Sequence, residues 1–235
     1  MYTERDHTMK YPYLLFDADD TLFDFPKASS NAFTVLCQTH DIPDTPDVRQ
    51  LYHEINAELW AAFDRGEVTK EFLTVERYVR FLNALALNRD PVQCNRDYLA
   101  ALGQSVYPLP HAEEVCRELA QRGHQLYIVT NAVASVQRSR LQRCSFGTLF
   151  TDAFISEEAG AAKPNPAYYD YVRSRVPEIT PKNTLVIGDS LTTDIRGANN
   201  AGLPCCWINY KRKSRPDDLQ IDYEIHDLRQ LLDIV

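Results

Sequence analysis

The chain has 235 residues, 44% of them hydrophobic and 25% charged, which is ordinary usage for a globular protein with a sizeable core. Its formal net charge of -8 argues against a broad nucleic-acid-binding face, although a local pocket can still bind a small anion. The polar N-terminal segment, the short apolar runs and the six cysteines without a CxxC pair lead us to expect a cytoplasmic protein with no membrane partner.

Short apolar runs, each ending in polar residues, predict strands that are buried on both faces. In chain order they are Tyr13–Phe16, Leu126–Val129, Phe154–Ile155, Leu185–Ile187 and Cys205–Ile208. Helical patterns are found at His111–Arg122, Val133–Cys144, Asn165–Arg175, Leu191–Ala201 and His226–Ile234. This alternation of strand and helix predicts an α/β fold with a doubly wound parallel sheet and helices on both faces.

The segment between the first two strands breaks the alternation. It shows amphipathic helical patterns at Lys27–Thr39, Val48–Phe63, Lys70–Leu87 and Gln93–Leu102. We interpret residues 26–104 as an inserted helical domain, and residues 1–25 with 105–235 as the α/β core. Aromatic residues at helical spacing in the insertion are expected to be core, with stacking on a base as the alternative. They are Trp60, Phe63, Tyr78 and Phe81.

Residues with useful chemistry follow the predicted strands. They are Asp17 and Asp19 after the first strand, Thr130 and Asn131 after the second, Lys163 in a later loop, and Asp189, Ser190 and Asp194 after the fourth. The carboxyl ends of parallel strands form one edge of a sheet, and ligands bind at that edge. We therefore expect these clusters to come together, although they are far apart in the sequence.

The acidic residues of this set predict a cation. Asp17, Asp19 and Asp189 bring together too much negative charge to coexist without one, and hard oxygen ligands favour Mg²⁺. Such a cation, with Lys163, would attract a phosphate dianion. One carboxylate can form an aspartyl-phosphate, while a second protonates the leaving alkoxide and later deprotonates water. The pattern predicts phosphoryl transfer from a small phosphomonoester.

Four motifs, in this order, closely resemble those of the haloacid dehalogenase (HAD) superfamily. They are DADDT at 17–21, IVTNA at 128–132, KP at 163–164 and GDSLTTD at 188–194. The resemblance spans the whole chain, because the helical insertion matches the type of cap that this family places after its first motif. It implies a Rossmann-like core and a cap that closes over the phosphate site and sets specificity.

The resemblance also implies roles for the acidic residues and the lysine. Asp17 corresponds to the nucleophile and to a Mg²⁺ ligand. Asp19 corresponds to the general acid/base, and its backbone carbonyl to a further metal ligand. Asp189 matches the metal-binding aspartate of the fourth motif. Lys163 matches the catalytic lysine that neutralises charge and binds the phosphate.

Polar residues beside these positions receive supporting roles from the same resemblance. Thr130 and Asn131 match the phosphate-binding motif, through a hydroxyl and an amide donor. Asp194 is expected to act through water or by holding the site together, and Ser190 to order the same loop. Asp20 is interpreted as structural.

Within the superfamily, the segments 17–25, 188–202 and 207–231 look most like bacterial pyrimidine 5′-nucleotidases, which hydrolyse UMP, dUMP and dTMP. Asp20 stands where that group often has glutamate. Dehalogenases need no metal and lack an aspartate at the position of Asp19, which favours a phosphatase. Two alternatives stay open: a HAD phosphatase for another small ester, such as phosphoglycolate or a sugar phosphate, and a non-catalytic HAD-derived binding module. Either a monomer or a dimer is compatible with the sequence.

Overall fold

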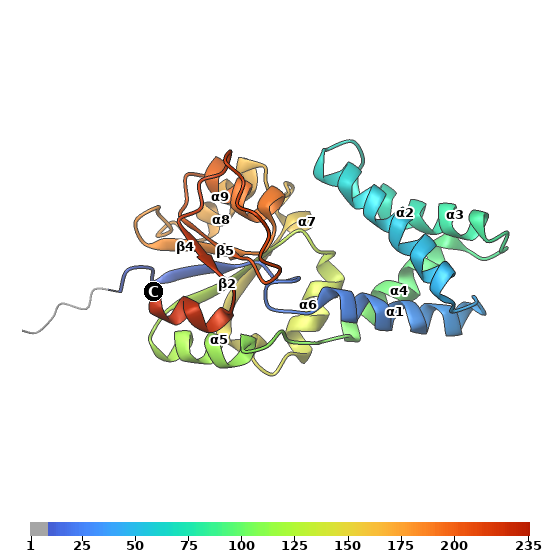
Figure 1. The fold of residues 1–235 in the computed structure, drawn as a ribbon, viewed down its shortest axis with the longest axis horizontal. Helices are drawn as coiled ribbons and strands as arrows, with labels where there is room; N and C mark the ends of the chain where they lie inside the picture. Colours follow the sequence, from blue (N-terminus) through green and yellow to red (C-terminus); the bar gives the residue numbers. More distant parts are fainter. Residues whose placement is uncertain (1–8) are drawn as a thin grey trace, which may run out of the picture. The chain divides into compact units, whose positions relative to one another are not determined.

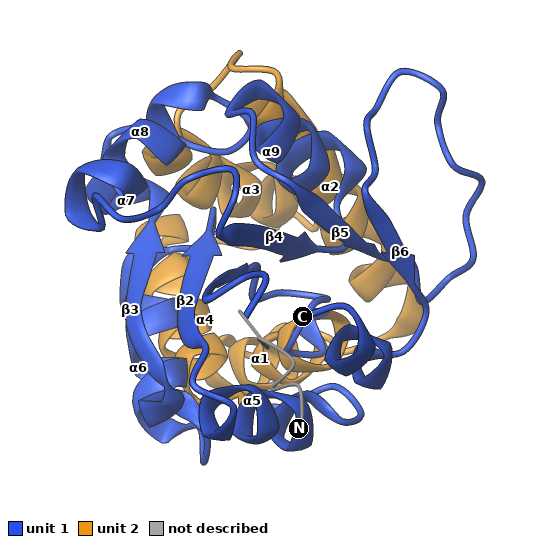
Figure 2. Ribbon diagram, turned by 90° about the vertical axis from the view of Figure 1, so that its left-hand side faces the viewer, with its two compact units in different colours: residues 1–25, 107–235 blue, residues 26–106 orange. Residues whose placement is uncertain are grey.

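The structure is a computed structural model that describes residues 9–235, so the polar N-terminus at 1–8 lies outside the described residues. The chain divides into two compact units (Figure 2), unit 1 with residues 1–25 and 107–235 and unit 2 with residues 26–106. Within residues 9–235, no helix is both long and apolar enough to cross a membrane.

Unit 1 is built on a six-stranded sheet with the order β3-β2-β1-β4-β5-β6 (Figure 1). Its strands are β1 (Tyr13–Phe16), β2 (Gln125–Thr130), β3 (Phe150–Ile155), β4 (Thr184–Gly188), β5 (Cys205–Ile208) and β6 (Tyr223–Ile225). Every neighbouring pair is parallel. The predicted α/β class with a parallel sheet is therefore confirmed.

Helices cover both faces of this sheet (Figure 2). Helices α8 (Pro166–Arg175) and α9 (Arg196–Asn200) pack on one face, where Tyr168 and Tyr169 join Val129 and Val186 in the core. Helices α5 (Ala112–Gln121) and α6 (Ala134–Arg143) lie on the other face, and the short helix α7 (Ser156–Ala159) follows β3. The strand order reverses beside β1, so the carboxyl end of β1 lies at the switch point where such folds bind ligands.

Parts of unit 1 differ from the expectations. Leu191–Ala201 is not one regular helix: a π-helical turn, η2 (Leu191–Ile195), precedes α9. The predicted C-terminal helix is a 3₁₀ helix, η3 (Leu228–Asp233), and a second 3₁₀ turn, η1 (Gly147–Leu149), precedes β3. The predicted strand Phe154–Ile155 is the buried end of β3, whose first half is exposed or half-buried and was not predicted. Only the last residue of β6 is buried, so β6 gives no apolar run that sequence patterns reveal.

Unit 2 contains four helices, α1 (Phe25–His40), α2 (Pro46–Asp64), α3 (Lys70–Ala84) and α4 (Pro91–Gln104). Thr45 and Thr69 cap the starts of α2 and α3 with their side-chain oxygens. Tyr78 and Phe81 are fully buried in an aromatic core that also contains Phe33, Tyr52 and Tyr98. Trp60 and Phe63 are only half-buried and meet edge to face, with ring centroids 5.6 Å apart.

Candidate active site

Asp17 is the first residue after β1, at the carboxyl edge of the sheet. Its backbone N–H donates to the carbonyl of Ile187 at 2.8 Å, which continues the pairing of β1 with β4. Asp17 is 8% exposed, so its carboxylate is nearly enclosed by the ends of the neighbouring strands. The position of this carboxylate is therefore fixed by the sheet itself.

Lys163 compensates the charge of Asp17. Its Nζ donates to Asp17 Oδ1 at 2.8 Å, to Asp194 Oδ1 at 2.6 Å and to the Val129 carbonyl at 2.7 Å, so all three ammonium protons are used. The residue is 2% exposed. Burial alone would lower the pKa of this amine, but Asp17 and Asp194 outweigh burial and hold the pKa well above its ordinary value. Lys163 is therefore a buried cation.

The backbone of Lys163 is held by Asn131, immediately after β2. Asn131 Nδ2 donates to the Lys163 carbonyl at 2.8 Å, and its Oδ1 accepts from the Lys163 N–H at 2.9 Å. Thr130, at the end of β2 and 2% exposed, accepts from the Ala132 N–H at 3.0 Å. Both residues thus lie at the same sheet edge as Asp17. The side chain of Asn131 holds the backbone of Lys163 in place, a role that the motif alone does not indicate. Phosphate binding by Thr130 or Asn131 stays a prediction.

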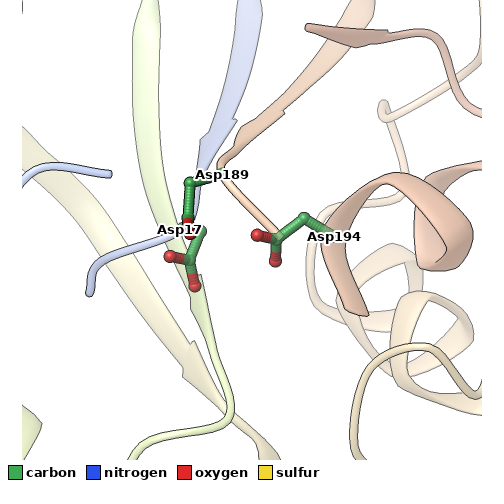
Figure 3. A group of neighbouring side chains, drawn as sticks. All are labelled: Asp17, Asp189 and Asp194. Carbon is green, nitrogen blue, oxygen red and sulfur yellow. The ribbon is translucent and has the colours of Figure 1, made fainter. Parts of the chain in front are cut away.

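Three carboxylates converge at this edge (Figure 3). One oxygen from each of Asp17, Asp189 and Asp194 lies within 4.8 Å of the other two. Asp194 is 1% exposed, and its Oδ2 accepts from the backbone N–H of Ser190 at 3.0 Å. Ser190 also caps η2 through its hydroxyl, which accepts from Thr193 N–H at 3.3 Å. Ser190 and Asp194 therefore order the loop after β4.

The electrostatics of this cluster fit a hard divalent cation. Burial, followed by the charges of Asp17 and Asp194, raises the pKa of Asp189 to about 8. Burial and Asp17 likewise raise the pKa of Asp194 to about 6. No hydrogen-bond donor in the described part of the chain reaches the carboxylate of Asp189. Among the same residues, Lys163 is the one ion-pair partner of the three carboxylates, through Asp17 and Asp194. An all-oxygen donor set with excess negative charge suits Mg²⁺ rather than zinc.

We expect the metal-free protein to lose stability as the pH rises from about 4 to about 8. The folded-state pKa values of Asp189 and Asp194, about 8 and about 6, exceed the ordinary value of 3.8. The folded state therefore holds protons that the unfolded state has released, and raising the pH lowers the free energy of unfolding. Urea unfolding in EDTA at about pH 5 and about pH 8 measures this difference. Mg²⁺ should restore stability at the higher pH; a metal-free protein that becomes more stable with rising pH would contradict the expectation.

Gly188, the last residue of β4, allows Asp194 to approach the backbone closely. A Cβ at Gly188 would lie 2.4 Å from Cγ and Oδ2 of Asp194. We expect Gly188→Ala to displace Asp194 from Lys163, to lower kcat and to cost about 1–3 kcal/mol of stability. Gly197→Ala is a milder comparison, because its Cβ would meet Tyr169 at 3.2 Å and the Cα of Pro164 at 3.3 Å, contacts that small shifts can relieve. Equal losses in the two variants would show that the contact with Asp194 is not the cause.

Asp19 lies beside this cluster but its side chain has a different partner. Its Oδ1 accepts from Arg140 Nη1 of α6 at 2.5 Å, and the side chain is 27% exposed. Burial raises the pKa of Asp19, although the charge of Arg140 opposes the rise. The side chain is not part of the three-carboxylate group, so a metal role for Asp19 rests on its backbone carbonyl. Sequence patterns did not single out Arg140; a charged residue on the buried side of a predicted helix is the signal that could have identified it.

A doubly wound parallel sheet carries an acidic site at its switch point, arranged around a buried lysine, and these are the features of the aspartate-dependent hydrolases that the four motifs indicate. The chain belongs to the haloacid dehalogenase-like hydrolase family, whose model matches residues 11–202. This confirms the family that the four motifs indicated.

Known relatives cover nearly the full chain. HAD-hydrolase YfnB of Bacillus subtilis is 36% identical over 96% of each chain. Its crystal structure, bound to magnesium, matches with a TM-score of 0.89 over 96% of this chain and 98% of that chain. The pyrimidine 5′-nucleotidase PynA of Streptococcus pneumoniae is 31% identical over 96% of this chain and 95% of its own. The pyrimidine 5′-nucleotidase YjjG of Escherichia coli is 32% identical over 95% and 99%.

Proposed function

We propose that this protein is a Mg²⁺-dependent phosphatase for pyrimidine nucleoside 5′-monophosphates. The observation that carries the proposal is the carboxylate of Asp17, held by the buried Lys163 at the switch point of the sheet. Asp19, the second residue after it, supplies a partly exposed carboxyl group beside the same site. This is the set of groups that phosphoryl transfer through an aspartyl-phosphate requires.

Each catalytic group has a chemical task. In the first step, the Asp17 carboxylate attacks phosphorus, the bond to the leaving oxygen breaks, and Asp19 gives that oxygen a proton. In the second step, water attacks the phosphorus of the aspartyl-phosphate, gives its proton to Asp19, and the bond to Asp17 breaks. Lys163 neutralises the phosphoryl oxygens through its positive charge, and the donors at Thr130 and Asn131 orient them.

The residues proposed to hold Mg²⁺ are Asp17 and Asp189 through their carboxylates and Asp19 through its backbone carbonyl. Asp194 already binds Lys163 and the Ser190 N–H, which supports a role in holding the site together. When bound, the cation offsets the charge of the phosphate and of the surrounding carboxylates. The magnesium in the structure of YfnB supports this assignment.

The choice of substrate rests on similarity. Two relatives that match almost end to end are pyrimidine 5′-nucleotidases, which favours a nucleotide over phosphoglycolate or a sugar phosphate. The nucleophile, the acid and the lysine are all present, which counts against a non-catalytic binding module. All six cysteines are buried and unpaired, which supports a cytoplasmic setting in which thiols stay reduced.

Phosphate release from a panel of small phosphomonoesters, with Mg²⁺ and with EDTA, tests the proposal. We expect UMP, dUMP or dTMP to give the highest kcat/KM, and EDTA to abolish release. If a sugar phosphate or phosphoglycolate leads, the nucleotidase assignment is wrong while the phosphatase mechanism stands. If no ester is hydrolysed, the result favours the binding-module alternative.

A further inference from the structure

Arg140 is a charged side chain in the interior of unit 1. It is 0% exposed, and its Nη1 donates to Asp19 Oδ1 at 2.5 Å. Burying a guanidinium is unfavourable unless a carboxylate compensates it. Asp19 is its sole ion-pair partner within residues 9–235. Arg140 and Asp19 therefore form an ion pair in which only the Asp19 side chain reaches solvent.

The burial of Arg140 excludes direct contact with a ligand. Its Nε and Nη2 are buried and donate to no acceptor within the described residues. Beyond the bond to Asp19, Nη1 has only a longer contact of 3.4 Å with Gln137 Oε1. Any effect of Arg140 on the reaction must therefore pass through Asp19, whose side chain is 27% exposed.

The turn that carries Asp19 also supports the guanidinium. The Arg140 guanidinium carbon lies 4.8 Å from the ring centroid of Phe23, which is fully buried and stacks on Phe146 at 5.9 Å. The Phe23 N–H donates to the Ala18 carbonyl at 3.0 Å, which closes the turn around Asp19. Arg140 is thus held by the same short loop that it orients.

We propose that Arg140 is the positioning residue of the general acid/base. By binding Oδ1 of Asp19, it leaves Oδ2 as the oxygen that carries the proton, and no donor in the described part of the chain reaches Oδ2. The inference rests on the proposed function. Oδ2 gives its proton to the leaving alkoxide as the phosphorus–oxygen bond breaks, and regains one from the water that attacks the aspartyl-phosphate. Asp19 therefore ends each turnover in the protonation state in which it began.

The test compares two phosphate esters that differ in whether their leaving oxygen needs a proton from a general acid. An alkyl phosphate such as UMP, or the best alkyl ester of the panel, needs protonation of its leaving oxygen, whereas p-nitrophenyl phosphate does not. We expect Arg140→Met to lower kcat/KM for the alkyl ester by about 10²-fold and for p-nitrophenyl phosphate by less than about 5-fold. Arg138→Met, on the same helix and paired with Glu158 at the surface, should change neither value.

Two further variants separate positioning from a loss of fold. Arg140→Lys keeps one donor and should recover part of the activity on the alkyl ester, even if Arg140→Met fails to fold. In an Asp19→Asn background, Arg140→Met should cause no further loss, because both changes remove the same function.

Equal losses on the two esters, or multiplied losses in the double variant, would overturn the inference. No loss in a folded Arg140→Met protein would overturn it as well. These outcomes differ from failure of the proposed function, in which the wild-type protein hydrolyses none of the esters.

Discussion

Asp17→Asn is expected to lower phosphatase kcat by at least about 10⁴-fold, because an amide cannot form the covalent phosphoryl intermediate. The fold should survive. Lys163 keeps its bonds to Asp194 and to the Val129 carbonyl, and the change removes one of three mutually repelling carboxylates. Steady-state phosphate release and urea unfolding of the same preparation measure the two effects together.

Asp20→Asn is the matched control for this variant. It makes the same chemical change three positions further along, at a carboxylate whose Oδ1 accepts from the Phe25 N–H at 3.3 Å. The new amide retains an oxygen for that bond, so turnover should stay within about 5-fold of wild type. Near-normal turnover in Asp17→Asn would show that another group is the nucleophile. An equal loss in both variants would show that charge, and not nucleophilicity, is what matters.

Lys163→Met is expected to destabilise the metal-free protein by about 3–5 kcal/mol, because Asp17 and Asp194 are left buried without a counter-charge. It should also lower kcat by about 10²–10³-fold, since the phosphoryl group loses a neighbouring positive charge. The loss of stability should be smaller when Mg²⁺ is present, because the cation replaces part of the missing charge.

Lys182→Met is the control for the buried lysine, since Lys182 is exposed and lies just before β4. Its free energy of unfolding should change by less than about 0.5 kcal/mol. Urea titrations of both variants in EDTA and in Mg²⁺ give the comparison. If Lys163→Met is as stable and as active as Lys182→Met, the ion pairs of Lys163 with Asp17 and Asp194 contribute neither to stability nor to catalysis.

The fold was predictable where burial leaves a clear pattern. Tyr13–Phe16 and Cys205–Ile208 match their predicted limits, because strands buried on both faces read as unbroken apolar runs. Tyr223–Ile225 was not predicted, because its first two residues are partly or fully exposed. The π-helical turn at Leu191–Ile195 has no periodicity of its own to reveal it, and it brings Asp194 back onto Ser190.

The site was predictable where a residue directly follows a strand. Asp17 and Asn131 directly follow β1 and β2, which are neighbouring parallel strands. The order of the strands therefore predicts that the two residues lie at the same edge of the sheet. Their partners do not follow in the same way. The side-chain amide of Asn131 binds the backbone of Lys163. Arg140 binds Asp19 from a helix that lies far along the chain. Such contacts depend on side-chain packing across elements, which motif spacing does not encode.

The most direct test of the central claim is to trap the covalent intermediate. Wild-type enzyme mixed with ³²P-labelled substrate and Mg²⁺ is quenched in acid, and the covalent label is counted. Borohydride then reduces the acyl phosphate to homoserine with release of the phosphate, and mass spectrometry identifies the aspartate that was converted. We predict label on Asp17 alone, and none in Asp17→Asn. Rapid turnover with no label on any residue, or label on a different residue, would contradict the aspartyl-phosphate mechanism.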